Sequence, residues 1–427
     1  MTIFETTSPI ASKDPGPSNE GPRADISLES LGYQVFSTLK APVGWAERVR
    51  HQAEVPADER DAHWLKHTGV QTRDSYFTLV VPIHNEAAGL NTFLGVLMHS
   101  FVPRAVNVQI VFVTNGCTDG SAQGIREALE TIARYHDDSA PGSNPQVKNL
   151  ETSLRDDGIR EPPIAVAVNS SQYVHIDTDT RGKANALNLG NELALQAGHR
   201  VVISIDSDCC PEPAALMTMF AEMHAEIQRN SERPGVVSGM QSLEWNPERE
   251  LFPAERTPGR MFKTHRDANK DARGVLGWLM GWDAQWLQRS GGVPQSVIED
   301  FALGLQADIL GGGKRVVDAK IWGYGPTERA DYWGAYRRWS QGAFQLRDRY
   351  AHDQENRAYV WRETAKEASP YSILYHVARE VYHSRMGLLT AAYRTVRHAY
   401  SFVMGWLDNR RDPKSQTWEQ LRSTRLR

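Results

Sequence analysis

Four short apolar runs, each followed by a polar loop and a segment with helical periodicity, dominate the middle of the chain. The runs are FTLVVPI (77–83), VQIVFV (108–113), IAVAV (164–168) and VVISI (201–205). The helical segments after them are 91–101, 120–138, 182–198 and 211–229. Strands that alternate with helices in this way form a mostly parallel central sheet flanked by helices. The repeat therefore predicts an α/β fold with Rossmann-like layers.

Changes in composition divide the 427 residues into four parts. Residues 1–30 are rich in Pro, Ser, Gly and charge, which predicts a disordered tail. The mixed segment 31–72 predicts a short helical lead-in, and 73–326 contains the strand and helix repeat. Strand signals stop near Thr327, so 327–427 is predicted to be a helical C-terminal region.

The C-terminal region carries an apolar seam. Three helices are predicted there, at 330–350, 369–383 and 384–408. The seam lies in the last of them and consists of Leu389, Tyr393, Val396, Tyr400, Val403 and Leu407. Such a seam packs against the α/β domain or against a second copy in a homodimer. Because Arg394 and Arg397 lie in this segment and Arg410 and Arg411 follow it, a basic amphipathic helix on a membrane surface is the alternative.

Composition excludes several classes of protein. A net charge of −4 argues against a nucleic acid partner, since nucleic-acid-binding proteins normally carry a basic surplus. The longest apolar runs are about seven residues, well short of the roughly 20 that span a bilayer, and the N-terminus lacks a secretory signal pattern. Three cysteines without metal-binding spacing indicate buried thiols in a reducing compartment. We expect a cytoplasmic protein, peripheral to the inner face of the membrane if the basic helix docks there.

An acidic pair, Asp206 and Asp208, directly follows the buried run 201–205. In parallel sheets, ligands bind outside the carboxyl ends of the strands. Two carboxylates at such an end suit a hard cation, Mn²⁺ or Mg²⁺, that could bridge phosphates. Acidic pairs of this spacing are common on any surface, so the position after a core strand is what favours a metal site.

Three other groups of residues admit both a functional and a structural interpretation. Lys183 stands at a helix start, where it suits phosphate or ribose, or it is a solvated lysine. Glu299 and Asp300 either cap a helix or include a general base. Arg338 and Trp339 suit a diphosphate and a sugar ring, or they form an ordinary helix surface.

Five motifs follow one another between residues 75 and 345. They are Pro82-Ile83-His84-Asn85-Glu86, Asn115-Gly116-Cys117-Thr118-Asp119-Gly120, Gly182-Lys183-Ala184-Asn185-Ala186-Leu187-Asn188, Asp206-Ser207-Asp208, and Glu299-Asp300 with Leu303-Gly304. In this order and spacing they resemble family 2 glycosyltransferases, which have the GT-A nucleotide-sugar-binding fold. Each motif is weak alone, and their order makes the resemblance specific.

The resemblance implies a role for each of these positions. On the donor side it implies Pro82, His84, Glu86 and Asn115 around the nucleoside, Lys183 near the ribose and phosphates, and Asp206 and Asp208 at the ribose and a metal-bound diphosphate. Asp300, beside Glu299, is implied to be the base that deprotonates the acceptor. Trp282 and Asp283 fall where such enzymes often line the acceptor site, and the C-terminal region is expected to complete that side.

The implied activity is inverting, non-processive transfer of a sugar from a UDP- or GDP-type donor to an acceptor nucleophile, with Mn²⁺ or Mg²⁺. Two departures from the family pattern matter. Asn115 stands where many members have Asp, which weakens a carboxylate contact to uracil. Ala335 stands where processive members have Gln before Arg338-Trp339. The alternatives are an inert nucleotide-sugar binding protein and a sugar-nucleotide pyrophosphorylase, although 84–90 lacks the Gly-rich basic loop of the latter class.

Overall fold

The computed structural model describes residues 76–99, 106–137, 147–150, 154, 158–168, 171–244, 275–324, 329–369, 374, 378 and 388–412. The predicted tail (1–30), the predicted lead-in (31–72) and nearly all of the predicted helix 369–383 lie outside these residues. The predicted boundary near Thr327 lies outside them as well.

Within the described residues, ten strands form one sheet in the order β3-β4-β5-β2-β1-β6-β9-β8-β10-β7. Their bounds are β1 Tyr76–Ile83, β2 Asn107–Asn115, β3 Lys148–Asn149, β4 Ile164–Val168, β5 Ser171–Thr178, β6 Val201–Ile205, β7 Cys209–Pro211, β8 Val236–Glu244, β9 Leu279–Asp283 and β10 Lys314–Tyr324. The neighbours β5, β2, β1 and β6 are parallel, as are β8 and β10, whereas β4, β9 and β7 run against their neighbours. The predicted α/β fold with a mostly parallel central sheet is confirmed.

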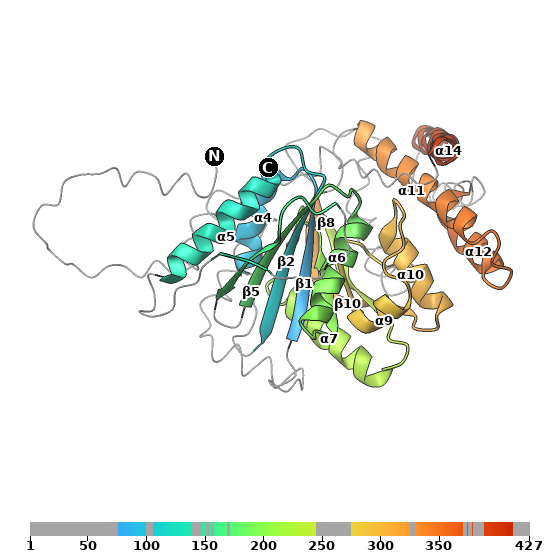
Figure 1. The fold of residues 1–427 in the computed structure, drawn as a ribbon. Coiled ribbons are helices and arrows are strands. Elements are labelled where there is room, and N and C mark those ends of the chain that lie inside the picture. The colour runs from blue at the N-terminus through green and yellow to red at the C-terminus, as the bar shows by residue number, and fades with distance from the viewer. Residues whose placement is uncertain are drawn as a thin grey trace, which may run out of the picture.

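Helices cover both faces of this sheet. The helices that pack on it are α4 Ala87–His99, α5 Ser121–Asp137, α6 Lys183–Gln196, α7 Ala215–Arg229, α9 Ala284–Arg289 and α10 Glu299–Ile309. Side chains alternate between the faces of a strand, so Leu79 of β1 packs with residues of α4, α5 and α7, while Val80 packs with residues of α6, α9 and α10. Figure 1 shows α4 and α5 on one side of the sheet and α6, α9 and α10 on the other. The flanking helices predicted from the sequence are confirmed.

The strand β5 is the outermost strand of the parallel group β5-β2-β1-β6, although its sequence, SQYVHIDT, is not an apolar run. It is the parallel neighbour of β2, and the predicted strand 164–168 (β4) is its antiparallel neighbour on the outer side. His175 and Asp177 can occupy a buried strand because both contact the hydroxyl of Thr114, at 2.9 and 2.8 Å. The apolar-run criterion misses β5 for this reason.

The C-terminal region consists of α11 Arg329–Arg349, α12 Arg357–Ala368 and α14 Leu388–Arg411, which Figure 1 shows beyond α10. Arg337 of α11 forms an ion pair with Asp408 of α14. The predicted apolar seam of α14 does not pack within the chain as a whole, because Val396 and Val403 are 62% and 51% exposed. The buried face is instead the polar one, which includes Arg397. None of the described helices has the length and apolar character required to cross a membrane.

Candidate active site at the carboxyl edge of the sheet

Three polar segments predicted from the sequence meet at the carboxyl ends of β1, β2 and β6. The Ser207 hydroxyl donates a hydrogen bond to the Pro82 carbonyl oxygen (3.2 Å), which ties the acidic pair to the end of β1. His84 Nδ1 lies 2.7 Å from the Asn115 carbonyl oxygen, which ties β1 to β2. The parallel register brings the ends of these strands level with one another.

Lys183, the first residue of α6, lies at the centre of this edge. Its ammonium is 2.6 Å from Asp206 Oδ1 and 3.1 Å from Glu299 Oε1, and it donates a hydrogen bond to the Gly277 carbonyl oxygen at 3.0 Å. An ammonium has three N–H donors, and three groups of the protein lie within contact distance of this one. The side chain is only 4% exposed, which excludes the interpretation of Lys183 as a solvated surface lysine. We call Lys183, Asp206, Glu299 and the adjacent Asp300 the Lys183 cluster.

Burial and mutual charge determine the ionisation of this cluster. Burial alone would lower the pKa of Lys183, but the carboxylates of Asp206, Glu299 and Asp300 raise it above its usual range, so the lysine stays charged. Burial and, to a smaller extent, the charge of the nearby Asp208 raise the pKa of Asp206 to about 7 against the opposing effect of Lys183. One buried cation therefore serves several carboxylates, and this edge favours a further positive charge.

Glu299 and Asp300, which begin α10, have different surroundings. Glu299 is buried and ion-paired with Lys183, whereas Asp300 is half-buried. The backbone N–H of Phe301 donates a hydrogen bond to Asp300 Oδ1 at 2.7 Å. Burial, and then the charge of Glu299, raise the pKa of Asp300 to about 6. A carboxylate with a pKa near the working pH suits proton abstraction, so Asp300 has the properties of a general base and Glu299 those of a charge partner.

Gly277 and Trp278 belong to this edge, although no motif indicated them. The backbone N–H of Asp206 donates a hydrogen bond to the Trp278 carbonyl oxygen at 3.0 Å. A side chain at position 277 would place its Cβ 2.7 Å from Asp300 Oδ2, so only glycine leaves room for that carboxylate. The segment 277–283 reads GWLMGWD, with two Gly-Trp pairs, and the first of them lies at the site.

The second Gly-Trp pair, Gly281-Trp282, lies away from the site. This corrects the prediction that Trp282 and Asp283 line the acceptor site. Trp282 is fully buried, and its indole N–H donates a hydrogen bond to Asn191 Oδ1 at 3.0 Å. Asp283 is fully buried as well and is ion-paired with Arg200. β9 runs antiparallel to β6, so the chain moves away from the carboxyl end of β6 as it passes from Trp278 to Trp282. Four residues of strand cover about 13 Å. These two residues therefore lie beside the first residues of β6, away from its carboxyl end.

Asn115 presents a buried amide at the end of β2. Its side chain is 1% exposed, and neither its Oδ1 nor its Nδ2 has a hydrogen-bond partner among the described residues. Buried polar groups are normally paired, so this amide can hydrogen-bond a bound ligand. The half-buried His84 ring contacts the backbone carbonyl oxygen of Asn115. The backbone N–H of the buried Glu86 donates a hydrogen bond to the Ser121 hydroxyl at 2.8 Å. The structure thus brings these three predicted nucleoside-pocket residues to neighbouring loops.

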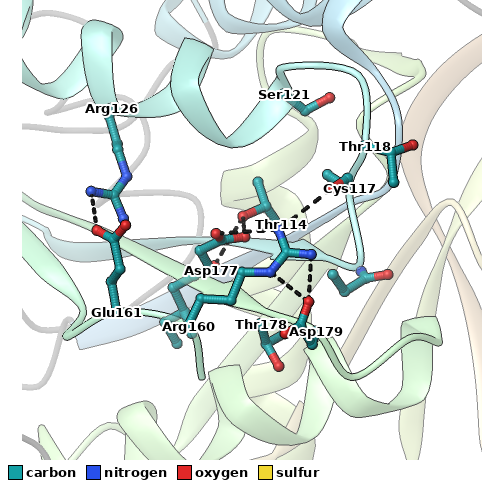
Figure 2. A network of polar contacts seen from close by, with 12 residues as sticks. Thr114, Cys117, Thr118, Ser121, Arg126, Arg160, Glu161, Asp177, Thr178 and Asp179 are labelled. Atoms are coloured by element: carbon teal, nitrogen blue, oxygen red, sulfur yellow. Dashed lines mark hydrogen bonds and ion pairs between the residues drawn. The ribbon is translucent and has the colours of Figure 1, made fainter. Parts of the chain in front are cut away.

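A second ionic cluster lies beside Asn115, at the ends of β2 and β5 (Figure 2). Arg160 is 2.5 Å from Asp179 and 3.6 Å from Asp177, and it donates a 3.5 Å hydrogen bond to the Cys117 carbonyl oxygen. The Thr114 hydroxyl donates a hydrogen bond to Asp177 Oδ1 at 2.8 Å. We call Arg160, Asp177 and Asp179 the Arg160 cluster. This cluster holds the loop after β2. The sequence patterns did not predict it because Asp177 lies near the end of β5, a strand that the apolar-run criterion misses.

Arg338 and Trp339 lie on α11, which packs against the segment that precedes Glu299. The backbone N–H of Val297 donates a hydrogen bond to Gln345 Oε1 at 3.1 Å. Trp339 is 48% exposed and makes an edge contact with Tyr336. The structure thus attaches the helix to the segment that precedes Glu299 and Asp300, while the predicted contacts of Arg338 and Trp339 with a donor stay predictions.

Asp206 and Asp208 fit the predicted metal in number and chemistry. No group of three or more His, Cys, Asp or Glu side chains able to hold a metal ion occurs in the described part of the chain. Mg²⁺ commonly takes one or two carboxylates and completes its shell with water and substrate phosphates. Asp208 is half-buried and raises the pKa of Asp206. A pair in which the charge of Asp208 disfavours ionisation of the buried Asp206 suits such a cation.

The fold and this edge define an α/β protein whose ligand site lies outside the carboxyl ends of its parallel strands. No protein-family model matches the chain, and no curated protein matches it. Among solved structures it is similar to the mannosyltransferase PcManGT from Pyrobaculum calidifontis in complex with GDP-Man and Mn²⁺, with 18% identity, a TM-score of 0.49, and coverage of 90% of this chain and 99% of that chain. It is also similar to S. aureus TarS 1–349, with 13% identity, a TM-score of 0.36, and coverage of 79% and 91%. For a structure of TarS 1–349 in complex with UDP-GlcNAc the identity is 12% and the TM-score is 0.35, with coverage of 79% of this chain and 92% of that chain.

Proposed function

We propose that the protein is a family 2 glycosyltransferase with the GT-A fold, which transfers a sugar from a UDP- or GDP-type donor to an acceptor by an inverting, non-processive reaction. The observation that carries the proposal is the Lys183 cluster. It joins the motif that contains Asp206 to the motif that contains Asp300 through one buried ammonium. Motifs far apart in the sequence therefore meet at one site, which supports the proposal.

The donor would bind across the ends of β1, β2 and β6. The buried Asn115 amide offers one donor and one acceptor to a base edge, with His84 and Glu86 on the neighbouring loop. Asp206 would meet the ribose and, with Asp208, the metal. A Mn²⁺ or Mg²⁺ ion held there would neutralise the charge of the departing diphosphate. Because the buried Lys183 ammonium is surrounded by Asp206, Glu299 and the Gly277 carbonyl oxygen, we propose that Lys183 acts through Asp206 rather than on a phosphate.

The acceptor would be activated by Asp300. Its carboxylate takes the proton of the acceptor hydroxyl, the acceptor oxygen forms a bond to the anomeric carbon, and the bond from that carbon to the diphosphate oxygen breaks. The leaving nucleoside diphosphate keeps the electron pair. Attack on the face opposite the leaving group inverts the anomeric centre. A pKa of about 6 leaves Asp300 mostly ionised at pH 7 and able to accept this proton.

The substitution Asp300→Asn tests the proposal. It keeps the size of the side chain and an oxygen for the Phe301 N–H, so we expect the Mn²⁺-dependent thermal shift with UDP- or GDP-sugars to persist. Turnover should fall by about 10²- to 10⁴-fold, the usual contribution of a general base. Asp318→Asn, on a carboxylate that is 73% exposed, is the matched control and should leave turnover unchanged. Unchanged turnover in Asp300→Asn would refute the base assignment, and stabilisation without turnover in the unmodified protein would favour an inert nucleotide-sugar binding protein.

A further inference from the structure

The helix α14 exposes a stripe of mostly apolar residues, whereas its most buried residues, Arg397, Ser401, Gly405 and Asn409, are mostly polar. The exposed residues repeat every three or four positions and form one stripe, which we call the outer face of α14: Ala392, Val396, Ala399, Tyr400, Val403, Trp406 and Arg410. Val396, Val403 and Tyr400 are 62%, 51% and 42% exposed. Surface helices normally have the opposite arrangement, so this orientation requires a cause within the chain.

Contacts with α11 supply that cause. Gly405 crosses α11 so closely that a side chain at this position would place its Cβ 2.6 Å from the Cβ of Ser340. Asn409 donates a hydrogen bond to Asp348 at 2.7 Å. Arg397 is buried, with its guanidinium 4.2 Å from the centre of the Tyr336 ring. The inner face is thus fixed by a glycine crossing and by polar pairs, and rotation that would bury the outer face would break them.

From this arrangement we propose that the outer face of α14 is a docking surface for a membrane rich in anionic phospholipids. Large exposed apolar faces mark interaction sites, and Tyr and Trp side chains favour the boundary between headgroups and acyl chains. Two of the exposed residues, Tyr400 and Trp406, are of this kind, and the Tyr400 ring also packs 4.9 Å from the Trp333 ring of α11. A helix with such a face lies in the plane of the membrane surface and does not span the bilayer.

Charge selects a membrane over a second copy of the chain. The exposed Arg410 and Arg411 stand at the end of the outer face. Asp412, the last residue that the structure describes, is exposed and acidic. In the sequence, residues 413–427 contain four basic side chains and one acidic, Glu419. A second copy would bring the same basic end to the contact, whereas anionic headgroups supply the opposite charge. Basic residues beside an apolar helix face strengthen binding to such membranes.

Sedimentation of the full chain with vesicles tests this proposal and needs no activity, so its outcome is independent of the proposed function. We expect binding to vesicles of equal phosphatidylglycerol and phosphatidylcholine, and weak binding to phosphatidylcholine alone. Val403→Asp and, separately, Val396→Asp should each weaken binding by at least about ten-fold. Arg410→Gln should weaken it about five-fold. Leu310→Asp, on an apolar residue that is 40% exposed after α10, is the matched control and should bind normally.

Three results would overturn the proposal. The first is that the unmodified protein stays in solution with the anionic vesicles. The second is that both valine variants bind as well as Leu310→Asp, which would place the contact elsewhere. The third is a stable dimer in light scattering without vesicles that Val403→Asp dissociates, which would assign the outer face to a second copy. Circular dichroism of the variants checks that each one is folded.

Discussion

The Lys183 cluster and the Arg160 cluster lie at the same edge of one sheet and both join loops through a cation, yet they differ in their exposure to water. The side chains of Lys183, Asp206 and Glu299 are 4%, 10% and 11% exposed. Arg160 and Asp179 are 34% and 67% exposed, and Asp177 alone is buried at 9%. Similar distances between charges therefore occur in very different surroundings.

This difference determines what each cluster can do. Removing one partner from a buried group of charges leaves the others without compensation, which is strongly destabilising, whereas exposed ion pairs contribute little because water and salt screen them. Burial also shifts the pKa of Asp206 and of Asp300 upward, into the range where enzymes exchange protons. The buried cluster thus suits chemistry, and the exposed one suits holding the loop after β2.

The largest effect on stability is expected for Lys183→Met. The substitution keeps an unbranched side chain one heavy atom shorter but leaves Asp206 and Glu299 buried without their cation, so the free energy of unfolding should fall by about 3–5 kcal/mol. Urea denaturation followed by circular dichroism measures it. Lys320→Met is the control, because Lys320 is 46% exposed and lies 3.9 Å from Asp318, and its effect should stay within about 0.5 kcal/mol.

A double variant sharpens this prediction. Adding Asp206→Asn to Lys183→Met removes one of the uncompensated charges, so part of the lost stability should return. If Lys183→Met were no more harmful than Lys320→Met, the buried cluster would behave like the exposed one, and the contrast between the two would fail.

The next effect is on pH dependence. Since Asp300 must be ionised to act as a base, kcat/KM should fall about ten-fold per pH unit below a pKa of about 6 and should rise to a plateau above it. The same shift acts on stability with the opposite sense. Between the ordinary value of 3.8 and about 6, the unfolded chain has released this proton while the folded protein retains it, so the contribution of Asp300 to stability decreases as pH rises. A pH profile of kcat/KM measures the first effect, and a flat profile down to pH 4.5 would contradict it.

The sequence predicts those parts of the fold and site that depend on neighbouring residues, and fails where contacts between distant residues decide the structure. Local patterns were sufficient for β1, β2 and β6 and for the helix start at Lys183, because apolar runs and helical periodicity are local properties. They could not choose between the two Gly-Trp pairs in GWLMGWD, since the antiparallel pairing of β9 with β6 decides which pair reaches the site. The ammonium of Lys183 was predicted to meet a ligand, and it is occupied by groups from residues 206, 277 and 299. Such long-range contacts are not encoded in any single motif.

The smallest effect is expected for Asp179→Asn in the Arg160 cluster. Figure 2 shows Asp179 in contact with the Arg160 guanidinium. The distance is 2.5 Å, but Asp179 is 67% exposed. Its loss should cost less than about 1 kcal/mol of unfolding free energy, and less still at high salt, because solvent screens exposed pairs. Arg160 would keep its contacts with Asp177 and with the Cys117 carbonyl oxygen, so the loop beside Asn115 should retain its position and any donor affinity should change little. Urea denaturation at low and high salt measures the effect. A loss comparable with that of Lys183→Met would mean that exposure does not separate the two clusters.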